Sequence, residues 1–188
     1  MVSNTKQIER KRMNLIDVKS PTDLKGLSIS ELTDLTAQAR QALMTKVSEH
    51  GGHFGPPMGA AEMIMALHYV FNSPVDKIVY DVSHQSYVHK MVTGRALAFL
   101  DHDHYDDVTG YTDPTESEHD FFNIGHTSTS ISLASGLATA RNLKGDSENI
   151  IAIIGDGSLS GGEAFEGLDY AATLDRNMII IVNDNDQS

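Results

Sequence analysis

The sequence of 188 residues contains no cysteine and no tryptophan, and cations are few. The absence of cysteine excludes a disulfide framework and thiol chemistry, and it is compatible with the reducing cytoplasm in which we expect the protein. With 26 acidic residues against 14 Lys and Arg, the net charge of -12 argues against a nucleic-acid partner. No apolar stretch is long enough to cross a membrane, and residues 1–11 lack the apolar core of a secretory signal.

The most informative stretch lies near the C-terminal end. The apolar, β-branched run 150–154 predicts a buried parallel strand, and Gly155-Asp156-Gly157-Ser158 follows it directly. Apolar residues at helical spacing then predict a helix over 161–174, and residues 178–182 predict the next strand. This order predicts an α/β fold with a mainly parallel sheet flanked by helices.

Two polar residues follow these two predicted strands. Asp156 and Asn185 would lie at the carboxyl ends of neighbouring strands, the edge at which open α/β sheets bind ligands. Carboxylate and amide oxygens suit Mg²⁺, and free N–H groups at the turn suit a phosphate group. The pattern therefore predicts a Mg²⁺–diphosphate site, although a Gly-Asp-Gly sequence alone also fits an ordinary tight turn.

The remaining predicted elements precede this stretch. Residues 1–30 are interpreted as an N-terminal arm and residues 31–188 as one domain. Apolar periodicity predicts a helix from about Ser30, where that serine offers an N-cap, and a short strand over 78–80. Three further helices are predicted over 58–71, 84–92 and 127–142.

Nine histidines are present, and three of them follow a predicted strand end or a glycine-containing turn: His53, His84 and His126. A neutral imidazole there can donate to a phosphate, move a proton or hold a substrate hydroxyl, although each could instead be structural. His68, on the predicted helix 58–71, is interpreted as a packing residue. His102 and His104 are interpreted as part of a solvated acidic loop rather than as metal ligands.

Four segments in the same order resemble the 1-deoxy-D-xylulose-5-phosphate synthase family, within the transketolase superfamily of thiamine-diphosphate enzymes. They are Ser48–Gly55, Asp81–Lys90 running into Thr93-Gly94-Arg95, Gly125–Ser132, and Gly155-Asp156-Gly157 with Asn183-Asp184-Asn185. The sequence departs from the family pattern at four places: Ser83 replaces the usual Gly, Thr127 the usual Ser, Pro56-Pro57 small residues, and Asp186-Gln187 the common Glu-Met.

The resemblance implies a thiamin diphosphate-binding fold and a set of site residues. Asp156, Asn185 and the backbone carbonyl of Gln187 would bind Mg²⁺. It implies that the residues contacting thiamine diphosphate are His84, Gly125, His126, Thr127, Gly157, Ser158 and Asn185. His53 and His84 would be catalytic, with His53 acting in substrate binding and proton transfer. The implied reaction condenses pyruvate with D-glyceraldehyde 3-phosphate, with loss of CO₂.

The resemblance also implies that the pyrimidine-binding and C-terminal domains are absent and that the diphosphate-binding domain is truncated at its C-terminal end. We therefore expect the isolated chain to be inactive and the whole enzyme to be a homodimer. An exposed apolar face is expected from Ile131, Leu133, Leu137 and the helix over 58–71. Two alternatives remain open: the N-terminal subunit of a split transketolase-like enzyme, and a non-catalytic module that binds diphosphates without preferring thiamine diphosphate.

Overall fold

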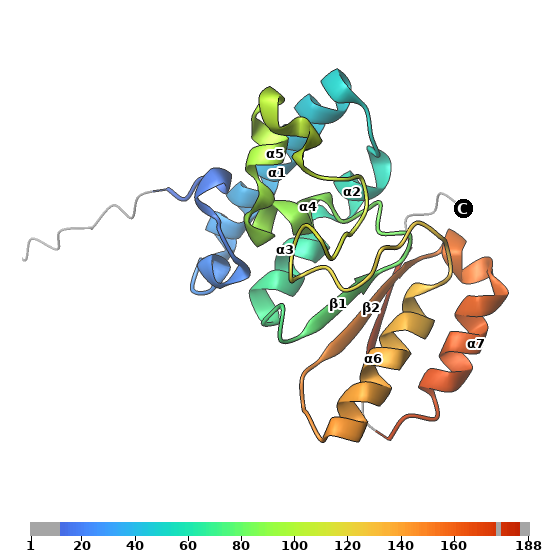
Figure 1. Cartoon of the computed structure of the whole chain (residues 1–188). Coiled ribbons are helices and arrows are strands. Elements are labelled where there is room, and N and C mark those ends of the chain that lie inside the picture. Colours follow the sequence, from blue (N-terminus) through green and yellow to red (C-terminus); the bar gives the residue numbers. More distant parts are fainter. Residues whose placement is uncertain (1–11, 176–177, 185–188) are drawn as a thin grey trace, which may run out of the picture.

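The computed structural model describes residues 12–175 and 178–184, which form a parallel sheet flanked by helices (Figure 1). The sheet of the described residues has three strands in the order β1 (Lys77–Tyr80), β2 (Ile150–Gly155) and β3 (Ile179–Asn183). Both pairings are parallel, with Ile78 opposite Ile151 and Ile153 opposite Ile181. The predicted α/β class and the parallel sheet are therefore confirmed.

Helices cover both faces of the sheet (Figure 1). They are α1 (Ile29–His50), α2 (Gly55–Gly59), α3 (Ala61–Val70), α4 (Tyr87–Lys90), α5 (Leu97–Leu100), α6 (Ser130–Lys144) and α7 (Gly162–Ala171). Shorter helical turns occur at Leu15–Asp17, Pro21–Leu24, Met91–Arg95, His102–Asp107 and Gly157–Ser160.

The strands alternate their side chains between two separate cores, because successive residues of a strand point to opposite faces. Ile151 and Ile153 pack in the core that includes α1, α3 and α5. Ile150, Ala152 and Ile154 pack instead in the core under α6 and α7. All five side chains are fully buried, as expected for the central strand of a sheet covered on both faces.

The N-terminal part of the described chain packs against the first core. Leu15, Val18 and Leu24 are at most 1% exposed and belong to the same core as α1. Helix α1 begins at Ile29, and its cap is Ser28 rather than the predicted Ser30. The Ser28 hydroxyl accepts from the Glu31 amide, and the Glu31 carboxylate accepts from the Ser28 amide, which makes a capping box.

Two predicted helices differ from the structure for reasons visible in the backbone. The helix predicted over 58–71 begins earlier, at Gly55, because prolines fit the first turn of a helix, and it is interrupted at Ala60, where ψ is -1°. The helix predicted over 84–92 begins only at Tyr87, after Val82 and Ser83, whose φ values of 56° and 67° are left-handed.

The other helix boundaries differ by a few residues. Helix α6 begins at Ser130 rather than 127, because Ser128 has a φ of 71°. Helix α7 covers only Gly162–Ala171 of the predicted 161–174. The expected exposed apolar face is wrong for Ile131 of α6, which is fully buried, and for Met65 of α3, which is 2% exposed. None of the described helices is both long and apolar enough to traverse a lipid bilayer.

Candidate functional site

A pocket of about 270 Å³ lies at the carboxyl edge of the sheet, where the segments after β1, β2 and β3 meet. Its lining includes three residues to which the sequence analysis gave no role of their own: Asp81, Gln85 and Asn183. The predicted residues that line it are His84, Thr127, Asp156, Gly157 and Ser158. The fold therefore brings together three of the four sequence segments that carried the resemblance, although they are far apart in the chain.

A close contact joins the segment before α6 to the turn after β2. The Ser128 hydroxyl, just before α6, donates to the Ser158 carbonyl after β2 over 2.6 Å. A side chain at Gly161 would place its Cβ 2.0 Å from that hydroxyl oxygen, so only glycine fits there. The pocket wall formed by Thr127 and Ser158 therefore depends on Gly161, which is outside the Gly-Asp-Gly motif.

Ser83 stands where the family usually has glycine, and its side-chain hydrogen bonds offset the backbone strain of that position. It adopts the left-handed φ of 67° that glycine would adopt without strain. Its hydroxyl donates to the Ile124 carbonyl over 2.9 Å and accepts from the Thr112 amide over 3.0 Å. The serine thus connects the turn after β1 to the segment that leads into α6.

His84 lies in the turn that follows Ser83 and lines the pocket. Burial is the main cause that lowers its pKa, and the neighbouring His53 lowers it further, while Asp81 opposes the shift. The imidazole is therefore mostly neutral at pH 7. Its Nδ1 is buried and has no hydrogen-bond partner among the described residues, which leaves a polar position that a ligand can satisfy.

His53 lies beside His84, in contact with three aromatic rings. Its ring centroid is 5.2 Å from that of His84, 5.3 Å from that of Tyr111 and 6.2 Å from that of Tyr87. The Tyr87 hydroxyl accepts from the His53 amide over 3.3 Å. His53 lines an adjoining hollow of about 260 Å³ rather than the pocket itself. The two predicted catalytic histidines are therefore neighbours, as a shared site requires.

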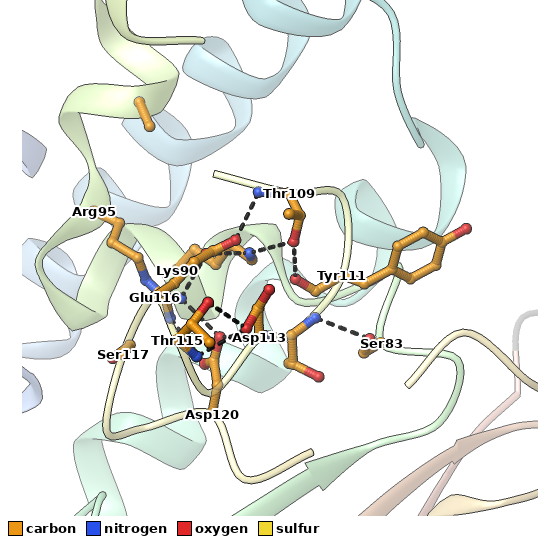
Figure 2. Close-up of polar contacts among 12 residues, drawn as sticks. Ser83, Lys90, Arg95, Thr109, Tyr111, Asp113, Thr115, Glu116, Ser117 and Asp120 are labelled. Carbon is orange, nitrogen blue, oxygen red and sulfur yellow. Dashed lines mark hydrogen bonds and ion pairs between the residues drawn. The ribbon is translucent and has the colours of Figure 1, made fainter. Parts of the chain in front are cut away.

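The segment 109–124, which follows the predicted acidic loop, is held by buried charged groups (Figure 2). Lys90 donates to Glu116 over 2.5 Å, and Arg95 donates to both Glu116 and Asp120. The Glu116 carboxylate also accepts from the Thr109 amide over 2.7 Å. Figure 2 shows the Tyr111 ring directed away from this network. The network thus fixes the segment that presents Tyr111 to His53.

A chain of hydrogen bonds continues inward from Asp120. His89 contacts Asp120 through Nε2 over 2.7 Å and His68 through Nδ1 over 2.8 Å, and both histidines are fully buried. Burial would raise the pKa of Asp120, but hydrogen bonds from His89 and Arg95 lower it well below its usual range. His68 is buried, as its interpretation as a packing residue requires, but it also belongs to this polar chain.

The other predicted site residues are placed differently. Gly125 and His126 line a neighbouring hollow of about 280 Å³ with Glu163, and both are exposed. Asn185 and Gln187 lie outside the described residues. His102 and His104 lie on an exposed turn, and the described ranges hold no group of three or more metal-ligating side chains. His104 contacts Asp107 through Nδ1 over 2.6 Å, and the assignment of both histidines to a solvated loop stays a prediction.

The site residues to which sequence reasoning gave no role of their own are Asp81, Gln85, Tyr111, Gly161 and Asn183. Asp81 had a usable signal, because it directly follows a predicted strand at the same sheet edge as Asp156. Tyr111 and Gly161 had no such signal in the sequence. The role of Tyr111 depends on ring contact with His53, and that of Gly161 depends on the close approach of Ser128.

Comparison with known proteins identifies the family. The sequence model described as 1-deoxy-D-xylulose-5-phosphate synthase matches residues 15–188. The chain belongs to the 1-deoxy-D-xylulose-5-phosphate synthase family. The synthase of Caldanaerobacter subterraneus subsp. tengcongensis is 50% identical over 93% of this chain, and that of Pelotomaculum thermopropionicum is 47% identical over the same share. The family match favours a synthase over a split transketolase.

The chain spans 28% and 27% of the lengths of these two synthases, respectively. Among solved structures, the fold resembles transketolase from Campylobacter jejuni, with a TM-score of 0.72 over 86% of this chain and 29% of that one. The sequence identity there is 21%, so this likeness shows the shared fold alone. It supports the transketolase-type architecture that the synthase family motifs imply.

Proposed function

We propose that this chain is the N-terminal, diphosphate-binding part of a 1-deoxy-D-xylulose-5-phosphate synthase that uses thiamine diphosphate and Mg²⁺. The whole enzyme would condense pyruvate with D-glyceraldehyde 3-phosphate, with loss of CO₂, as a homodimer in the cytoplasm. The observation that carries the proposal is the pocket, which gathers His84, Thr127, Asp156, Gly157 and Ser158 in a chain of this family.

The residues present fit the proposed groups. The Asp156 carboxylate is a hard oxygen ligand of the kind that Mg²⁺ prefers, and Asn185 and the Gln187 carbonyl would complete the protein ligands. A Cβ built at Gly155, which lines the pocket with Gly157 and Ser158, would contact nothing within 4 Å, so the pocket is open at the start of this turn. The buried, unpartnered Nδ1 of His84 is a further position for a polar contact.

Thiamine diphosphate, when bound, supplies an electron sink for the carbanion left after decarboxylation. The residues of this chain bind and orient the reactants. His84, mostly neutral because burial lowers its pKa, can accept or donate one hydrogen bond without adding charge. His53 has Nδ1 near the Tyr87 hydroxyl at 3.5 Å, and its Nε2 has no partner among the described residues. That nitrogen can hold a substrate hydroxyl or exchange its proton.

The chain by itself would bind cofactor without turnover, because the remaining groups of the reaction would come from the pyrimidine-binding part. We expect no synthase activity from the purified 188-residue chain. Production of 1-deoxy-D-xylulose 5-phosphate by this chain alone would contradict that expectation.

Calorimetric titration of the chain with thiamine diphosphate, with and without Mg²⁺, tests the proposal. Binding should require Mg²⁺ and be lost in Asp156→Ala, while Asp169→Ala, an exposed aspartate on α7, should bind like the wild type. Binding that ignores Mg²⁺ or survives Asp156→Ala would contradict the metal assignment. Equal affinity for inorganic diphosphate and thiamine diphosphate would favour the non-catalytic module instead.

A further inference from the structure

Asp81 is a buried carboxylate at the end of β1, 1% exposed, and it bonds to a distant segment. One oxygen accepts from the Ser128 amide and the other from the Ser130 amide, both over 3.0 Å. Its own amide donates to the Ile153 carbonyl of β2 over 2.8 Å. This one residue therefore ties together the turn after β1, the segment before α6 and the central strand.

The two turns that Asp81 joins have unusual backbone conformations. Val82 and Ser83 on one side and Ser128 on the other have φ values of 56°, 67° and 71°. A left-handed conformation is rare for residues with a side chain, and rarest for a β-branched residue such as Val82. Such conformations persist only where surrounding contacts enforce them, and they gather at functional sites.

These turns carry two separate parts of the pocket lining. His84 and Gln85 follow the first turn, and Thr127 precedes Ser128 in the second. The Ser128 hydroxyl in turn donates to the Ser158 carbonyl, so it also fixes the Gly157-Ser158 part of the lining. A movement of the Asp81 carboxylate would therefore shift His84 and Thr127 relative to each other and to the Gly157-Ser158 turn.

We propose that Asp81 is a positioning residue of the diphosphate-binding pocket, which sets the spacing of His84, Thr127 and Ser158 without contacting the ligand's reacting atoms. This inference rests on the proposed function only for the identity of the ligand. The spacing itself is a property of the ligand-free chain and can be measured there.

The chain offers a matched control at the opposite end of the same strand. Asp76 is 6% exposed, and it also accepts from two backbone amides, those of Asn72 and Asn149, each over 2.7 Å. Asparagine at either position keeps the shape but replaces one acceptor oxygen by a donor group that faces a backbone N–H. Both variants should therefore lose stability, whereas only Asp81→Asn disturbs the pocket.

The first measurement is ligand-free NMR of ¹⁵N-labelled chain. In Asp81→Asn we expect shifts in the amide signals of Thr127, Gly157 and Ser158 and in the His84 ring signals, with these signals unchanged in Asp76→Asn. If Asp81→Asn does not fold, Asp81→Ser, which places no donor amide there, is read in the same way. Unchanged pocket signals, or unfolding of both Asp81 variants while Asp76→Asn folds, would overturn the proposal.

The second measurement is thiamine diphosphate binding in the presence of Mg²⁺, well below the unfolding temperatures of the variants. Asp81→Asn should bind about tenfold more weakly or worse, whereas Asp76→Asn should match the wild type. Equal affinities in the two variants would overturn the positioning role. Absence of binding by the wild type would count against the proposed function, and the ligand-free NMR signals would still decide the role of Asp81.

Discussion

The ammonium nitrogen of Lys90 lies 2.5 Å from a carboxylate oxygen of Glu116, and their side chains are only 0% and 11% exposed. Glu116 comes from the segment 109–124 and Lys90 from α4, so this contact joins the two (Figure 2). Burial lowers the pKa of Lys90, and the hydrogen bond that it donates to Glu116 opposes that shift. The ion pair therefore anchors the segment that carries Tyr111.

Glu116→Gln should destabilise the chain strongly, because the buried Lys90 ammonium would lose the carboxylate with which it now pairs. We expect a loss of about 3–5 kcal/mol in the free energy of unfolding, as for other broken buried pairs. Glu62→Gln, which breaks the exposed pair with Arg40, should cost no more than about 1 kcal/mol. Urea unfolding of both variants checks this, and equal costs would contradict the anchoring role.

Tyr111→Leu should change the environment of His53, because the two rings are in edge contact at 5.3 Å. Tyr111→Phe keeps the ring and should leave the His53 ring-proton signals close to those of the wild type. NMR of the His53 imidazole checks this, with the exposed His102 as an internal reference that should not move. His53 signals that are identical in all three proteins would mean that the rings are apart in solution.

Gly161→Ala should be costly, because the new Cβ would lie 2.0 Å from the Ser128 hydroxyl oxygen and 2.8 Å from its Cβ. We expect a loss of about 1–3 kcal/mol in the free energy of unfolding. Its neighbour Gly162 has open space around the same position, so Gly162→Ala is the control. Adding Ser128→Gly to Gly161→Ala should recover part of the loss, since it removes the clashing side chain. If the double variant recovers no stability, the loss in Gly161→Ala does not come from a clash with the Ser128 side chain.

Acid should destabilise the fold before carboxylates titrate. Burial lowers the pKa of His119 to about 4, with further lowering from His89 and Arg95, while Asp120 opposes the shift. The unfolded chain, with the ordinary histidine pKa of 6.5, therefore takes up protons first as the pH falls. The stability that neutral His119 contributes is complete above pH 6.5 and is lost progressively down to about pH 4.

The matching variant is His119→Gln, which can still bond to the Ser73 hydroxyl now 2.8 Å from His119. Between pH 7.5 and 5, the wild type should lose about 1–2 kcal/mol more of its unfolding free energy than His119→Gln. Chemical denaturation at the two pH values measures the difference. Parallel losses would show that His119 is not a source of the acid sensitivity.

Local signals in the sequence determined the fold class, the strand that precedes Gly155-Asp156-Gly157 and the existence of most helices. A run such as 150–154 is apolar at every position because both faces of its strand are covered, and that pattern survives in a single sequence. Residues that follow such strands meet at one edge, and Asp156 and His84, each predicted to follow a strand, both line the pocket.

Helix boundaries and supporting contacts depended on the tertiary structure. Helices α4 and α6 begin late because Val82, Ser83 and Ser128 adopt left-handed conformations that none of these residue types favours alone. Contacts between distant segments enforce those conformations, and no local pattern records them.

The sequence by itself therefore determined which chemistry gathers at the sheet edge, because strand order and polar strand ends are local properties. Only the tertiary structure decided how that edge is held. The hydrogen bonds that Asp81 accepts from the Ser128 and Ser130 amides, and the buried pair of Lys90 with Glu116, join residues between 26 and 49 positions apart. Such pairings form only when the chain packs, because a buried charge costs free energy unless a partner group compensates it.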